Sequence, residues 1–154
     1  MKKQPKEIVI SSDKAVFWLD SNGRWHNKHG EFEHKKIIDF FHSSIRKDKD
    51  GYHVAQATDS YTEKVYFKYE DTALFVFNIF TKEDIYLLLN TKKQIRLNPE
   101  ELFIKKDRLY AKDGEELVKF TEQSMIKISK FMENDNDVYF IKINDKRYHI
   151  PVIR

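Results

Sequence analysis

The chain has 154 residues and no cysteine. This absence excludes disulfide bonds, thiolate nucleophiles and cysteine-ligated zinc. Only four glycines and three prolines occur, which is too few for a flexible Gly-rich or extended Pro-rich linker. We therefore expect folded structure along nearly the whole chain.

Long hydrophobic runs are also missing near the N-terminus. Residues 1–13 form a polar leader in which only Ile8–Ile10 is an apolar run. A signal peptide needs about 7–15 apolar residues and a membrane span about 20. We therefore expect a soluble cytoplasmic protein with no membrane partner.

Charge of one sign is not concentrated anywhere. The 28 Lys and Arg residues are interleaved with 25 Asp and Glu residues, for a net charge of +3. A nucleic-acid interface would need a basic stripe, so nucleic acid is not a favoured partner. Phosphate loops, dinucleotide fingerprints and Gly-x-Ser-x-Gly elbows are absent as well, and we expect no cofactor.

Aromatic residues are abundant, with twelve Phe and eight Tyr, and many lie in runs typical of strands. The stretch Lys64–Phe80 is the most prominent. It predicts two strands joined by the polar turn Glu70-Asp71-Thr72. The second strand, Ala73–Phe80, is apolar at almost every position and is expected to be buried on both faces.

Two segments have apolar residues at helical spacing. These residues are Ile37, Ile38, Phe41 and Ile45 in the first segment, and Met125, Ile128 and Met132 in the second. The first segment predicts a helix from about residue 34 to 47. In the second, Thr121 is a suitable N-cap. After it, Val138–Ile143 and Tyr148–Val152 predict a hairpin around Asn144-Asp145-Lys146.

The two halves of the chain follow the same order of short strands, a helix and a hairpin, at an offset of 83–88 residues. We therefore expect an α+β fold, mostly antiparallel sheet in two related lobes, each with one amphipathic helix packed on short strands. The lobes are expected to span residues 1–97 and 98–154, or to form one integrated domain with an internal repeat. A cleft between lobes is a common place for a ligand.

Several short motifs, taken in order, resemble a known family. They are Asp20–Trp25, Asp48–Tyr52, Val65–Ala73, Asn98–Leu102 and Arg108–Tyr110. Their order from about Leu19 to Val152 is similar to the bacterial family catalogued as domain of unknown function 1285. The resemblance implies a two-lobed α+β protein. The family has no established activity to carry over.

Three histidines are the candidate metal ligands. His26, His29 and His34 lie within nine residues, with Glu31 and Glu33 between them, and imidazole and carboxylate groups bind zinc. However, a strand, a turn and a helix start would point these histidines in different directions. We therefore expect no metal site, and keep the three histidines as the residues to check.

Two other groups are candidate binding residues. Arg24 and Trp25 follow a turn, and Trp25 is either a binding anchor or part of the core. Glu70, Asp71 and Thr72 are either an acidic binding site or a polar turn whose side chains satisfy backbone amides.

The function predicted from these features is a non-enzymatic module that binds a small molecule or a protein partner between lobes. The first alternative is a hydrolase or metal-dependent enzyme that uses His and carboxylates. The second alternative is a weak nucleic-acid binder.

Overall fold

The computed structural model describes residues 6–154, so the first five residues of the polar leader lie outside the described part. The chain divides into two compact units, Met1–Ala73 and Leu74–Arg154. Across residues 6–154 there are two α-helices among many short strands, most of them paired antiparallel. The α+β class expected from the sequence is confirmed. No helix in this range is long and apolar enough to cross a membrane.

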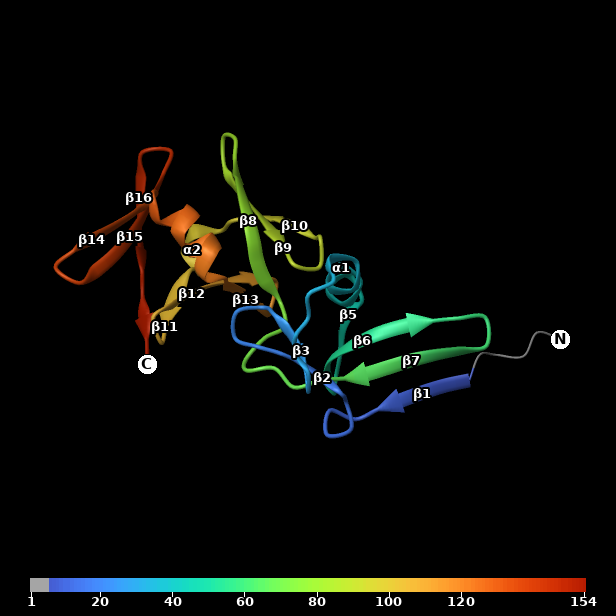
Figure 1. Cartoon of the computed structure of the whole chain (residues 1–154). Helices are drawn as coiled ribbons and strands as arrows, with labels where there is room; N and C mark the ends of the chain where they lie inside the picture. Colours follow the sequence, from blue (N-terminus) through green and yellow to red (C-terminus); the bar gives the residue numbers. More distant parts are fainter. Residues whose placement is uncertain (1–5) are drawn as a thin grey trace. The chain divides into compact units, whose positions relative to one another are not determined.

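The first unit combines two small sheets with one helix. Its elements are β1 (Lys6–Ile10), β2 (Phe17–Leu19), β3 (Trp25–Asn27), β4 (Gly30–Glu31), α1 (Lys35–Ser43), β5 (Ile45–Asp48), β6 (Gly51–Ala57) and β7 (Tyr61–Tyr66). One sheet has the strand order β1-β7-β6-β5 and the other β2-β3-β4. In Figure 1, β1 runs beside the long β6–β7 hairpin, and it pairs with β7 in parallel.

An aromatic cluster forms the core of the first unit. Trp25 is 1% exposed, and its ring lies within 6 Å of the rings of Phe17, Phe41 and Phe67. The indole Nε1 donates a hydrogen bond of 3.1 Å to Nδ1 of the buried His42. The large aromatic content of the sequence therefore goes into packing, with an indole whose polar N–H is satisfied inside the core.

The second unit is built on a larger sheet. Its elements are β8 (Phe75–Thr81), β9 (Ile85–Leu89), β10 (Gln94–Arg96), η1 (Pro99–Glu101), β11 (Phe103–Lys105), β12 (Arg108–Asp113), β13 (Glu116–Phe120), α2 (Glu122–Ser129), β14 (Met132–Asp135), β15 (Val138–Ile143), β16 (Lys146–Ile150) and β17 (Val152–Ile153). The main sheet has the order β10-β9-β8-β13-β12-β11-β17, and β14-β15-β16 form a second sheet. Apolar side chains of this unit, including Ile128 of α2, make one buried core.

The prediction that Lys64–Phe80 forms a hairpin is wrong. β7 pairs with β1 and β6, whereas β8 pairs with β9 and in parallel with β13. The two runs are strands, but they belong to different sheets and different units. The units also differ from the expected lobes of residues 1–97 and 98–154, because β8, β9 and β10 share the sheet of β13.

The β8 strand is not buried on both faces along its length. Phe75 and Val76 are buried, but Phe77 is 37% and Phe80 is 40% exposed. The pairing of β8 with β9 shifts register between Val76 and Asn78, which places Phe77 at a bulge. A bulge inserts an extra residue and redirects the side chains that follow, so the apolar run alone overstated the burial.

Both helices are shorter than expected, and a strand follows each one. The hydroxyls of Ser43 and Ser44 bond back to the carbonyl oxygen of Phe40 where α1 ends. Such bonds compete with continued helix. Ile45, assigned to the helix from the sequence, instead begins β5 and pairs with Val54.

The start of α2 agrees with the sequence. The Thr121 hydroxyl accepts a hydrogen bond of 3.1 Å from the backbone N–H of Ser124, as an N-cap residue does. The helix ends at Ser129, and Met132, expected on its apolar face, opens β14.

The same sequence of elements occurs once in each unit. Helix α1 is followed by the antiparallel strands β5, β6 and β7, and helix α2 by β14, β15 and β16. Ile45 pairs with Val54 in the first set, and Met132 pairs with Ile141 in the second. This common order agrees with the similarity seen in the sequence, while a duplication of the chain stays a prediction.

Candidate functional site

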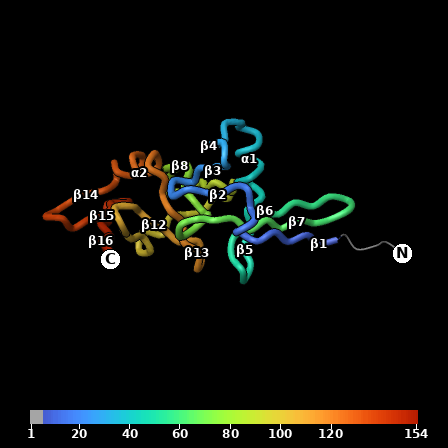
Figure 2. Tube along the Cα trace, turned by 60° about the horizontal axis from the view of Figure 1, so that its bottom comes forward, coloured from blue at the N-terminus to red at the C-terminus, as the bar shows by residue number. Residues whose placement is uncertain are grey.

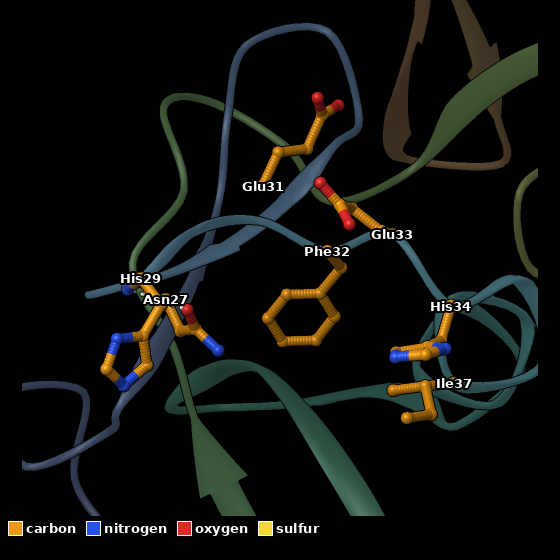
Figure 3. A pocket seen from close by; sticks show the side chains of 7 residues that line it. All are labelled: Asn27, His29, Glu31, Phe32, Glu33, His34 and Ile37. Carbon is orange, nitrogen blue, oxygen red and sulfur yellow. Dashed lines mark hydrogen bonds between the residues drawn. The ribbon is translucent and has the colours of Figure 1, made fainter.

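A surface pocket of about 320 Å³ lies between the β3–β4 turn and the start of α1. Its lining consists of Asn27, His29, Glu31, Phe32, Glu33, His34 and Ile37. Figure 3 shows the Phe32 ring at the centre, with Asn27 and His29 on one side and His34 and Ile37 on the other. Its lining residues all belong to the first unit. Figure 2 shows the backbone there, where β4 leads into α1.

Local hydrogen bonds and one glycine form the turn that carries the pocket. The side-chain oxygen of Asn27 accepts a hydrogen bond of 2.9 Å from the backbone N–H of His29. Gly30 has φ of +118°, a conformation that residues with a side chain rarely adopt. The N–H of Phe32 then bonds the carbonyl oxygen of Trp25 at 2.9 Å, which fixes the chain after β4.

The pocket combines an apolar surface with ionisable groups. Phe32 packs edge-on against Phe41 at 5.1 Å between ring centres, and Ile37 is 47% exposed. Within residues 6–154, the side chains of Glu33, His29 and His34 have no hydrogen-bond or ion-pair partner. Apolar groups beside such polar groups are what a binding site offers to a ligand.

Glu31 is the exception among these charged residues. Its carboxylate lies 3.5 Å from Nε of Arg24, and both side chains are about half exposed. An exposed pair of this kind contributes roughly 0–1 kcal/mol, so it leaves Glu31 available for exchange with a ligand.

The three candidate metal ligands do not come together. His29 and His34 line the pocket, while Nε2 of His26 lies 2.7 Å from Oδ2 of Asp20. Throughout the described part of the chain, no group of three or more His, Asp or Glu residues is placed to hold a metal ion.

Asp20 organises the turn between β2 and β3. Burial raises its pKa, but the hydrogen bond from His26 and those from the backbone N–H groups of Arg24 and Asn22 outweigh that effect. The pKa of Asp20 is therefore lower than its ordinary value, and the ionised carboxylate holds His26 in place.

The other predicted binding residues are not part of the pocket lining. Trp25 lies in the aromatic core, and Arg24 is at the surface beside Glu31. Thr72 is 2% exposed, and its hydroxyl donates to the Tyr52 hydroxyl at 3.5 Å. A binding role for Arg24, Trp25, Glu70, Asp71 and Thr72 stays a prediction.

The sequence pointed to only part of this pocket. The sequence showed that His29, Glu31, Glu33 and His34 lie close together along the chain. Asn27, Phe32 and Ile37 were not expected beside them. Ile37 was assigned to the core because of its helical spacing. The sequence signal that could have indicated an exposed Ile37 is the surplus of apolar residues on α1. In the structure both Ile37 and Phe40 are nearly half exposed.

A second polar cluster, also not expected, links β5, β6 and β7. The Tyr66 hydroxyl donates to Oδ2 of Asp48 at 2.6 Å, and Nζ of Lys64 lies 3.4 Å from the same oxygen. The N–H of Asp50 donates to Oδ1 at 2.9 Å. These contacts, the Tyr66 hydrogen bond above all, outweigh desolvation and lower the pKa of Asp48 to about 2.

This cluster predicts a specific pH dependence. A carboxyl whose pKa is lowered on folding stabilises the protein above its ordinary pKa of 3.8 and loses that contribution as the pH falls towards about 2. An Asp48→Asn variant should therefore be less stable than the natural chain at about pH 6 and nearly equal to it at about pH 2. Urea denaturation across this range measures the difference, and an unchanged difference at both ends would contradict the assignment.

The dependence of stability on pH in the alkaline range supplies a control for the same contact. The hydrogen bond to Asp48 raises the pKa of Tyr66 from 10.0 to about 12. Its contribution is present below about pH 10 and is lost as the pH rises through about 12. A Tyr66→Phe variant should remove this alkaline dependence and weaken the acid dependence of Asp48, because the Tyr66 hydrogen bond is the largest of the contacts that lower the Asp48 pKa.

Comparisons with known proteins give matches among solved structures. No protein-family model matches the sequence, and no curated protein matches it. One similar structure is a DUF1285 family protein from Silicibacter pomeroyi DSS-3, with a TM-score of 0.61 and 9% identity over 96% of this chain and 83% of that one. Another is a DUF1285 family protein from Shewanella baltica OS155, with a TM-score of 0.52 and 13% identity over 75% of this chain and 91% of that one. The chain therefore has the fold of DUF1285 family proteins.

Proposed function

We propose that this protein is a binding module that takes a small molecule, or a side chain of a protein partner, in the pocket of residues 27–37. The observation that carries the proposal is the environment of Phe32 and Ile37. These apolar side chains lie among Glu33, His29 and His34, whose side chains have no hydrogen-bond or ion-pair partner within residues 6–154.

The pocket has the size and chemistry of a modest site. Its volume of about 320 Å³ is at the lower end of the range of about 300–1,000 Å³ common for ligand pockets. Phe32 and Ile37 would contribute apolar contact area, and the glutamates and histidines would orient polar groups of the ligand.

The test is a screen of small fragments followed by amide ¹H–¹⁵N spectra of the full chain. We expect the fragments that bind to shift the signals of residues 27–37. An Ile37→Ser variant should weaken binding about tenfold, because contact with one aliphatic side chain is worth on the order of 1.5 kcal/mol. A Glu33→Gln variant should alter the preference between cationic and neutral fragments.

Phe40 supplies the matched control. It lies on the same helix and is 46% exposed, close to the 47% of Ile37, but it does not line the pocket. A Phe40→Ser variant should leave fragment affinity unchanged. Fragments that shift signals elsewhere, or equal effects of the two variants, would reject the proposal. Steady turnover in a hydrolase screen, abolished by His34→Gln, would instead assign the enzymatic alternative to this pocket.

A further inference from the structure

Trp18 is an aromatic residue that the fold turns outward. The neighbouring Leu19 is 2% exposed, and Phe17 packs edge-on against Phe41 at 4.8 Å between ring centres. Because side chains alternate along a strand, Trp18 lies on the opposite face of β2 and is 41% exposed. An exposed tryptophan is a frequent binding anchor.

A cross-strand contact holds the Trp18 ring in one orientation. Trp18 is paired with His26 across β2 and β3, and the two rings are stacked with an angle of 9° between their planes. His26 in turn lies 2.7 Å from the carboxylate of Asp20. The indole is therefore fixed before any ligand arrives, which lowers the entropy cost of binding.

The surroundings of Trp18 are apolar and positively charged. A pocket of about 500 Å³ adjoins the indole, and its other lining residues are Ala15, Val16, Asn27, Lys28 and His29. Lys68 and Trp18 are paired in an isolated parallel β-bridge. Paired residues project to the same face, so the Lys68 side chain leaves the backbone on the same face as the Trp18 indole. In the described part of the chain, neither Lys28 nor Lys68 has an ion-pair partner.

We propose that this pocket binds a small planar aromatic anion, with its ring on the indole of Trp18 and its negative group at Lys28. Stacking on an indole favours a flat ring over an aliphatic one. Lys28 lines this pocket and favours an anion, and no carboxylate lines it. The site shares Asn27 and His29 with the pocket around Phe32 but is a separate binding surface, and it does not depend on the function proposed there.

Three probes of similar size test the proposal with the full chain: 2-naphthoate, 2-naphthylmethylammonium and decalin-2-carboxylate. Titration at low salt, followed by calorimetry and amide spectra, should show 2-naphthoate binding most tightly. Trp18→Ala should weaken its binding about tenfold or more. Lys28→Gln should weaken it about two- to fivefold, and added salt should have a similar effect on the natural chain.

Lys49 provides a charge-matched control, because it is exposed at the β5–β6 turn and does not line the pocket. Lys49→Gln should leave the affinity for 2-naphthoate unchanged. Trp18→Phe, which keeps an aromatic ring on the strand, should retain part of that affinity and serves as the second variant beside Trp18→Ala. Equal binding of the cationic or the saturated probe would overturn the proposal. So would an unchanged affinity in Trp18→Ala, or no binding at millimolar probe.

Discussion

Replacing Trp25 by alanine is expected to lower the free energy of unfolding of the first unit by about 3–5 kcal/mol. Trp25 is 1% exposed and contacts the rings of Phe17, Phe41 and Phe67. Removing the indole leaves a cavity among these rings and also removes the hydrogen bond donor to His42. Single domains are stable by only about 5–15 kcal/mol, so much of the stability of this unit should be lost.

The chain contains a matched control for this result, because its other tryptophan is Trp18. Trp18 is 41% exposed, and Trp18→Ala should change the free energy of unfolding by about 1 kcal/mol or less. Urea denaturation followed by circular dichroism, with hydrogen exchange of residues 6–73, measures both variants. Similar losses in the two variants would mean that Trp25 does not anchor the core.

The second large effect is expected from a charge at Phe75. An aspartate there should destabilise the second unit by more than about 5 kcal/mol, because it removes a buried ring and leaves an unpaired carboxylate inside the sheet. Phe75 is 1% exposed, and its backbone N–H donates to the side chain of the buried Asn90 at 2.9 Å. We expect Phe75→Asp to abolish hydrogen-exchange protection in β8, β9 and β13.

Phe77, two residues further along β8, should behave differently. It is 37% exposed at the bulge, so an aspartate there can remain in water. Phe77→Asp should cost about 1–2 kcal/mol, from the lost contacts of the ring. From the sequence alone, Ala73–Phe80 was expected to be buried on both faces, which would make a charge at either position similarly damaging. Equal effects of the two substitutions would support that earlier expectation and contradict the bulge.

Local chemistry explains the features that were predicted correctly. Thr121 caps α2 because its hydroxyl can reach the N–H of Ser124. The turn between β15 and β16 is at Asn144 and Asp145, which both have positive φ and are residue types that tolerate it. In each case the side chains that decide the structure lie within a few residues of each other.

The candidate pocket shows where local chemistry was not enough. His29 and His34 were candidate metal ligands because they are close in sequence, but a metal site needs donors that converge in space. Trp25 is buried in the aromatic core, and the side chain of His26 is bound to the carboxylate of Asp20. Ile37 was left at the surface because only one side of the short helix α1 contacts the core, through Phe41 and His42.

The sequence by itself determined the α+β class, the N-cap of α2 and the last hairpin with its turn, since each depends on neighbouring residues. Only the tertiary structure decided which strand pairs with which, and therefore that Lys64–Tyr66 and Phe75–Phe80 lie in different units. It also decided where α1 stops, and that Trp18 faces outward while Trp25 faces inward. The physical reason is that β-strands gain their hydrogen bonds and burial from distant partners, so an apolar run predicts a strand but not its neighbours.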